Sequence, residues 1–195
     1  MQYTTIKVCS HPRTGSHYVT ALLSTNFFGS NNYLQYYGGH LPWGMESSAK
    51  VEVRSNKKIG YVYITRDTDA TLHSIFVLRK RFGLVTKDFP TFLQTKYAKM
   101  WSPHTEATVT RTTLTTTTKH NNISQFFKGI QFKPTVYLDW HKTQWQFESP
   151  NLIIIDYDKI LGDLQGTLDE VATWLGIPTK TYKNIEQQVG WKLAH

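Results

Sequence analysis

The segment Ser10-His11-Pro12-Arg13-Thr14-Gly15-Ser16-His17-Tyr18 combines a cation, two hydroxyl groups and a glycine turn. It lies between a run typical of a strand and a run with helical spacing, so several backbone N–H groups converge at a helix start. The helix dipole adds to the charge of Arg13, and Thr14 and Ser16 add hydroxyl donors. This pattern indicates an anion site, although a glycine turn before a helix also occurs by chance. It is not a Walker A loop, which needs four residues between its glycines and then Lys-Ser/Thr.

Arg66 and Ser74 form a second candidate group, eight residues apart after another run typical of a strand. Ser74 falls two turns along a helix that would begin beside Arg66, so both side chains can close on one phosphate. The alternative is that Arg66 pairs at the surface with Asp67 or Asp69.

His40 stands in the segment Gly38-Gly39-His40-Leu41-Pro42-Trp43. The paired glycines let the backbone bend, and Pro42 restricts the residue before it. A histidine fixed there has a pKa near neutrality and can act as a general base. A lone loop histidine is more often structural, so this segment alone leaves both readings open.

Three strand-then-helix units must position these groups. Strands are predicted at 5–9, 59–65 and 151–155, and the apolar character of 151–155 predicts a strand covered on both faces. The first helix that follows is predicted at 17–28. The second is predicted to begin at the capping carboxylates 67–69 and to end at Gly83. The third is predicted to begin at a capping box at 167–170 and to end at Gly176. Such units predict an α/β fold with a central parallel sheet flanked by helices. Ligands of such sheets bind beyond the carboxyl ends of the strands, where both candidate groups lie.

The middle of the chain gives weaker patterns. Helices are predicted at 92–101 and 136–147. The threonine-rich tract 108–118 is too β-branched for a good helix and too polar for a core strand, which predicts a loop. We therefore expect a single domain over 1–195, with a mobile lid or loop at about 84–135.

The composition narrows the class of protein. Charged residues are 18% and apolar residues 39% of the chain, which excludes collagen, coiled coil and an acidic disordered tail. No apolar run approaches a membrane span, no signal peptide is visible, and Cys9 is the single cysteine, so we expect a soluble cytoplasmic protein. The net charge of +8 favours an anionic partner, although a lysine-rich surface would give the same balance.

Together, the three motifs resemble the sulfotransferases that use 3′-phosphoadenosine-5′-phosphosulfate (PAPS), especially the cytosolic ones. In that family a Pro-Lys-Ser-Gly-Thr-Thr-Trp type loop holds the 5′-phosphosulfate, and residues 12–18 resemble it. An arginine followed eight residues later by a serine binds the 3′-phosphate, which matches Arg66 and Ser74. A His-Leu-Pro segment carries the catalytic base, which matches His40. A late strand running into Tyr-Glu-Asp resembles residues 155–158, before a helix that ends in Leu-Gly.

The resemblance implies a P-loop-like nucleotide-binding sulfotransferase fold and transfer of a sulfuryl group without a metal. His40 would take the proton of a small acceptor bearing a hydroxyl or amine, and Arg13 would stabilise developing charge. The implied cofactor-binding residues are Arg13, Thr14, Gly15, Ser16, His17, Tyr18, Arg66, Ser74 and Lys192.

The chain departs from the family pattern in several places. Arg13 replaces the usual loop lysine, and Tyr18 replaces the tryptophan that stacks on adenine. The C-terminal segment over the 3′-phosphate is represented only by Gly190-Trp191-Lys192. The chain is also shorter than typical members, so the acceptor pocket is either open or completed by a partner, and a homodimer is left open.

Two alternatives remain from the residues alone. A P-loop-type kinase or NTPase would use Asp156, at the end of an apolar strand, to hold Mg²⁺, but it lacks the Gly-Lys-Ser/Thr element. A non-catalytic basic module that binds nucleic acid fits the charge and the aromatic content, but no motif of that class is present, and we expect no nucleic-acid partner.

Overall fold

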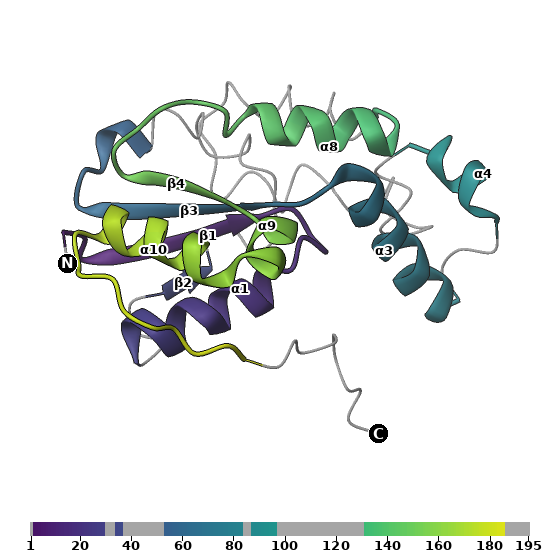
Figure 1. Cartoon of the computed structure of the whole chain (residues 1–195). Coiled ribbons are helices and arrows are strands. Elements are labelled where there is room, and N and C mark those ends of the chain that lie inside the picture. Colours follow the sequence, from purple (N-terminus) through teal and green to yellow (C-terminus); the bar gives the residue numbers. More distant parts are fainter. Residues whose placement is uncertain (1, 30–33, 37–52, 84–86, 97–130, 186–195) are drawn as a thin grey trace.

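The structure, a computed structural model, describes residues 2–29, 34–36, 53–83, 87–96 and 131–185. Four parallel strands form a sheet in the order β2-β1-β3-β4 (Figure 1). In the register, Val8 lies opposite Val62, and Val62 lies opposite Ile153. The strands are β1 Thr5–Ser10, β2 Leu34–Tyr36, β3 Ile59–Thr65 and β4 Leu152–Asp156. The predicted α/β class with a central parallel sheet is confirmed.

The two central strands bury both of their faces, because alternate side chains enter two apolar clusters. On one face Ile6, Val8, Val62 and Ile64 pack with the helices α1 (Ser16–Leu23) and α10 (Leu164–Leu175). On the other face Cys9, Tyr61 and Tyr63 pack with Trp145, just after helix α8 (Pro134–Thr143). Helices therefore cover both faces of the sheet, α1 and α10 on one side and α8 on the other (Figure 1).

The helix after β3 has the predicted ends. Helix α3 spans Thr68–Arg81, and the Asp67 carboxylate caps it by accepting a hydrogen bond from the Ala70 N–H at 2.8 Å. The chain turns away at Gly83, whose φ of +66° is in the left-handed region that glycine adopts readily. The predicted helix at 17–28 is also present, as α1 continued by one π-helical segment, η1 (Ser24–Phe28).

The predicted capping box at 167–170 is wrong. Helix α10 begins one turn earlier, at Leu164, and Asp163 caps it by accepting from the Gly166 N–H at 2.9 Å. Thr167 therefore lies inside the helix, where it is buried. The predicted end is confirmed, because Gly176 forms the left-handed C-cap at φ +67°.

Among the described strands β4 lies at the edge of the sheet, and one of its faces is open, so the prediction of a strand covered on both faces is wrong. Its order in the sheet gives it one neighbour, β3. Ile155 is buried, but Ile154, on the opposite face, is 43% exposed. A continuous apolar run therefore does not distinguish a covered central strand from an edge strand with one open face.

The predicted helices of the middle region differ in extent. Helix α4 covers only Phe89–Leu93, so the part of the prediction at 94–96 is wrong and 97–101 lies outside the described residues. Helix α8 confirms most of 136–147, ending at Thr143. The threonine tract and most of the predicted lid, 84–86 and 97–130, also lie outside the described residues. Within the described part of the chain, no helix has the length and apolar character to cross a membrane.

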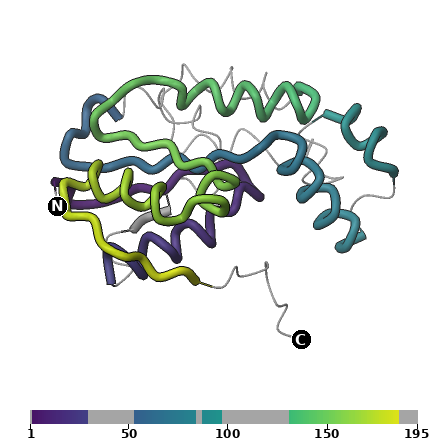
Figure 2. The backbone as a smooth tube through the Cα atoms, viewed as in Figure 1, coloured from purple at the N-terminus to yellow at the C-terminus, as the bar shows by residue number. Residues whose placement is uncertain are grey.

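Residues 177–185 run back along α1 and η1 after α10 ends (Figure 2). Asn26, which is 5% exposed, joins the two segments, because its side chain donates to the Lys183 carbonyl at 2.9 Å and accepts from the Lys183 N–H at 2.8 Å. Lys180 Nζ adds a hydrogen bond to the Asn26 carbonyl at 2.6 Å. This packing holds the chain beside the helix that begins at the predicted anion site.

Candidate functional site

The loop between β1 and α1 has the backbone conformation that an anion site requires. Gly15 is the N-cap of α1, with φ +82° and ψ 17°, and no side chain caps this helix start among the described residues. Arg13 has φ +70°, the only positive value at a non-glycine residue in the described ranges. An uncapped helix start leaves its first N–H groups, and the positive end of the helix dipole, for a ligand.

Gly15 cannot be replaced without moving its neighbour. A Cβ atom at this position would overlap the edge of the Tyr157 ring at Cδ2 and Cε2. Tyr157 is the first residue of helix α9 (Tyr157–Gly162), which follows β4 directly. The close approach therefore brings the end of β4 against the loop after β1.

The side chains of the loop divide into buried and exposed groups. Thr14 is 2% exposed, and its hydroxyl donates to the His11 carbonyl at 2.8 Å. Ser16 is also buried, whereas His17 is exposed. Thr14 thus helps to close the turn, and its role toward a cofactor stays a prediction.

Tyr18 lies in the core rather than on an open surface. It is 6% exposed, its hydroxyl donates to Asn184 Oδ1 at 3.0 Å, and its ring meets that of Tyr157 edge to face with centroids 6.0 Å apart. This position leaves little ring face for adenine in the described structure. The stacking role expected of Tyr18 stays a prediction.

The structure brings the two predicted phosphate-binding groups together. Arg13 Nε donates to Ser74 Oγ at 3.1 Å, across 61 residues of sequence. Arg66 Nη1 donates to the Arg13 carbonyl at 3.4 Å. The carboxyl ends of β1 and β3 are adjacent in the parallel sheet, so the loops that follow them meet.

The two guanidinium groups are close enough to affect each other. Burial, and then the neighbouring charge of Arg66, lower the pKa of Arg13 from its ordinary value. Arg13 remains cationic at neutral pH, because arginine starts from so high a value. Two adjacent cations beside an uncapped helix start form an environment that a phosphate or sulfate would stabilise.

Arg66 has an acidic neighbour that the sequence did not indicate. Its Nε lies 3.6 Å from Oδ1 of Asp158, and its guanidinium carbon lies 4.9 Å from the centre of the Tyr157 ring. The Asp67 carboxylate is used to cap α3 instead. Among the described residues Arg66 forms no ion pair with Asp67 or Asp69, so the predicted alternative partners are wrong and the acidic neighbour is Asp158.

Comparison with solved structures identifies the fold. A sulfotransferase from Alicyclobacillus acidocaldarius superposes with a TM-score of 0.54 and 9% identity, over 91% of this chain and 83% of that one. A mouse sulfotransferase complexed with PAP superposes with a TM-score of 0.53 and 15% identity, over 93% of this chain. The chain has the sulfotransferase fold. It matches only 61% of the mouse protein's length. Neither a protein-family model nor a curated protein sequence matches this chain.

Two residues of the predicted sulfotransferase site lie outside the described residues. These are His40, the predicted base, and Lys192, predicted to cover the 3′-phosphate. Their roles stay predictions. The residues that the structure places near one another are the loop 10–16, Arg66 and Ser74.

A buried histidine beneath the loop was missed at the sequence level. His141 of α8 is 2% exposed, and its Nδ1 lies 2.9 Å from the Tyr63 hydroxyl. Its ring meets that of His11 edge to face at 5.4 Å. Burial lowers the pKa of His141 to about 4, so the ring is neutral at physiological pH. Burial also raises the pKa of Tyr63, so the phenol stays protonated beside the neutral imidazole.

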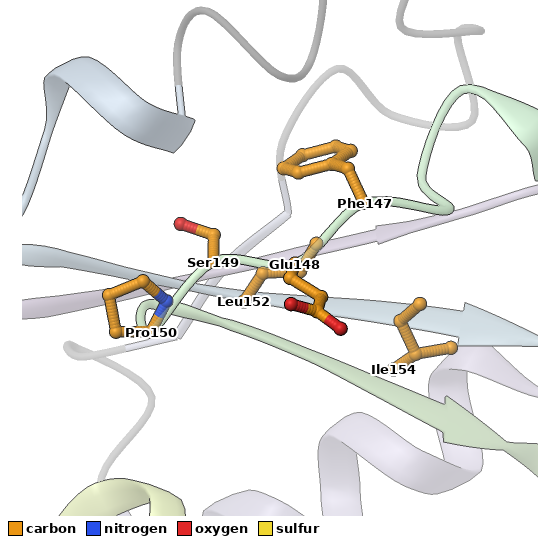
Figure 3. A pocket seen from close by; sticks show the side chains of 6 residues that line it. All are labelled: Phe147, Glu148, Ser149, Pro150, Leu152 and Ile154. Carbon is orange, nitrogen blue, oxygen red and sulfur yellow. The ribbon is translucent and has the colours of Figure 1, made fainter.

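A separate hollow lies beside the edge strand, away from this site. Its volume is about 490 Å³, and Figure 3 shows its lining side chains around the loop before β4 and the first part of that strand. The lining residues are Phe147, Glu148, Ser149, Pro150, Leu152 and Ile154. Arg13 and Arg66 follow the carboxyl ends of β1 and β3, so this hollow does not contain the predicted nucleotide-binding residues.

Proposed function

We propose that this chain is a PAPS-dependent sulfotransferase that moves a sulfuryl group to a hydroxyl or amine of a small acceptor. The observation that carries the proposal is the contact between Arg13 and Ser74, together with that between Arg66 and the Arg13 carbonyl. Two groups predicted separately as phosphate ligands thus occupy one place. The sulfotransferase fold supports the proposal, and one protein of similar fold is complexed with PAP.

The residues present fit a nucleotide with phosphate at both ends. The uncapped α1 start, with Gly15 at φ +82°, suits the 5′ end, and Arg66 with Ser74 suits the 3′-phosphate. When bound, PAPS supplies an activated sulfuryl group. Arg13 would stabilise the negative charge that develops during transfer, because its guanidinium lies at the same loop. His40 keeps its predicted role of removing the acceptor proton.

One contact argues against the kinase alternative. That alternative needs the Asp156 carboxylate for Mg²⁺, but Asp156 Oδ1 accepts from the N–H groups of Asp158 and Lys159, at 2.8 and 3.0 Å, and so caps α9. Capping accounts for Asp156 at the end of β4 without a metal, and the chain also lacks the Gly-Lys-Ser/Thr element that the kinase needs. The sulfotransferase proposal requires no such ligand.

The proposal is tested by ligand-induced stabilisation. We expect 3′-phosphoadenosine-5′-phosphate (PAP) to raise the melting temperature by mass action, and ATP with Mg²⁺ to raise it less. A larger shift with ATP and Mg²⁺ would contradict the proposal and favour the kinase. Sulfuryl transfer from PAPS to a panel of phenols, alcohols, amines and sugars then tests the reaction itself.

The Arg66 assignment sharpens this test. Arg66→Ala should weaken PAP binding by about 1.5–3 kcal/mol, or roughly 10- to 150-fold, the range for a hydrogen bond to a charged group. Binding of adenosine-5′-phosphate (AMP), which lacks the 3′-phosphate, should hardly change. Arg81→Ala is the matched control, since Arg81 is an exposed arginine in the last turn of α3. If Arg66→Ala weakens the binding of PAP and of AMP equally, Arg66 does not bind the 3′-phosphate.

A further inference from the structure

Tyr157 lies against three residues of the predicted site, Gly15, Tyr18 and Arg66. Its ring lies where a Gly15 side chain would be, beneath the Arg66 guanidinium at 4.9 Å, and edge to face with Tyr18 at 6.0 Å. Three loops that follow β1, β3 and β4 therefore meet on one ring. The ring is only partly buried and packs against the main apolar cluster.

A guanidinium that must bind a phosphate needs a fixed position, because an arginine side chain has many rotamers to lose on binding. Arg66 has two neighbours that fix it in the described structure. The Tyr157 ring supplies a face for cation–π attraction to the guanidinium. The second neighbour is Asp158, the residue after Tyr157, whose Oδ1 lies 3.6 Å from Arg66 Nε. The Oδ2 atom of Asp158 accepts a hydrogen bond from the Asp67 N–H at 3.4 Å.

Gly15 gives a second reason why the ring matters. A glycine at φ +82° has the widest choice of conformations of any residue in the unbound loop. The Tyr157 ring fills the space above its Cα, so the turn has a wall on that side. The same ring thus limits the motion of the turn and of Arg66.

We propose that Tyr157 is a positioning residue of this site, whose ring holds the Arg66 guanidinium and the Gly15 turn ready for the nucleotide. This inference rests on the proposed function, since it names what prepares the 3′-phosphate contact. Tyr157 itself does not contact the reacting atoms. Its effect is therefore expected in the selectivity for the 3′-phosphate, expressed as the ratio of the dissociation constants of AMP and PAP.

The first experiment compares two substitutions by calorimetry. Tyr157→Phe keeps the ring and should leave the ratio within twofold of wild type. Tyr157→Leu removes the ring face and should lower the ratio about threefold to thirtyfold, the range that cation–π energies imply. In the Arg66→Ala background, Tyr157→Leu should cause no further fall, because the group it positions is gone.

A second series covers the case in which Tyr157→Leu does not fold. Phenylalanines with one, two and three ring fluorines at position 157 keep the shape of the ring while weakening its negative face. The selectivity ratio should fall stepwise along the series. A ring that only filled space would give a constant ratio.

A third measurement needs no ligand. In the proton NMR spectrum, the Arg66 Nε–H signal is identified by its loss in Arg66→Ala. The ring current of Tyr157 should displace the chemical shift of this signal, and Tyr157→Leu should return it toward the value of a free arginine. The ratio of the AMP and PAP dissociation constants could stay constant in Tyr157→Leu and across the fluorinated series, while the wild type still binds PAP selectively. That result would overturn the role of Tyr157 and leave the proposed function standing. Equal wild-type binding of PAP and AMP would overturn the proposed function and the inference with it.

Discussion

Arg13 has a left-handed backbone at φ +70°, which costs a residue with a Cβ roughly 1–2 kcal/mol. Two contacts hold it there, the hydrogen bond from its Nε to Ser74 and the one that its carbonyl accepts from Arg66. Strained residues of this kind persist where the surrounding structure fixes them, often at functional sites. At the scale of single residues, Arg13 is thus the point where the two predicted phosphate-binding groups are joined.

Arg13→Ala should lower kcat by roughly 10²–10³, the cost of removing one donor to a developing charge, and should weaken PAP binding much less. Arg13→Lys should recover part of the rate, because the ammonium keeps the charge but not the planar fork. Steady-state kinetics with PAPS and calorimetry with PAP separate the two effects. A normal kcat in Arg13→Ala would remove Arg13 from the chemistry.

His141 should make the fold sensitive to mild acid. Its pKa of about 4 in the folded protein lies below the ordinary value near 6.5, so the unfolded chain binds the proton first. Above pH 6.5 the group has no effect, and stability is lost as pH falls from there toward 4. The loss at pH 5 should be about 2 kcal/mol. Urea unfolding at pH 7 and pH 5 should show this difference in the wild type and not in His141→Gln, and equal losses in both proteins would contradict it.

At the scale of elements, the sequence was most informative where several local signals agree. Strand β3 spans 59–65 as predicted, because an unbroken apolar run is followed directly by the Asp67 cap of α3. The start of α10 was misplaced because Asp163 and Thr167 lie one turn apart, so both fit the helical stripe. Packing of Leu164 against the core decides for Asp163. His141 was missed because its partner Tyr63 is 78 residues away, and no local pattern reports such a pair.

The cap of α10 can be tested by a pair of substitutions. Asp163→Ala should destabilise the fold by about 1 kcal/mol, since it removes the acceptor of the Gly166 N–H. Glu170→Ala should cost less than about 0.5 kcal/mol, because its contact with Lys159 is an exposed ion pair. Urea unfolding measures both. A larger loss of unfolding free energy in Glu170→Ala than in Asp163→Ala would support the capping box at 167–170 instead.

At the scale of the whole molecule, the parallel sheet places the loops after β1, β3 and β4 at the same end. The order of the motifs along the chain therefore predicted that the two phosphate-binding groups would meet. The order of the motifs could not predict that the Tyr157 ring lies between these two groups. The close packing of three loops depends on their backbone angles, which the residue types do not determine. The cations of this site belong to a chain with a net charge of +8.

Because protein cations neutralise the transferred group, sulfuryl transfer from PAPS should continue in excess EDTA at an unchanged rate. The measurement is initial rate with and without chelator, with a Mg²⁺-dependent kinase as the positive control for chelation. Activity that disappears with EDTA and returns with added Mg²⁺ would favour the kinase alternative.

The parallel sheet has a consequence for how the chain matures during synthesis. Strand β3 pairs on one side with β1 and on the other with β4, whose first residue, Leu152, comes 91 residues after its partner Tyr61. At translation rates of about 5–20 residues per second, β3 is synthesised roughly 5–18 seconds before that partner. Through this interval one edge of β3, with its backbone N–H and C=O groups, stays without its native neighbour, which is a state open to wrong pairing between nascent chains. The open edge of β3 is closed only when β4 has been synthesised and pairs with it.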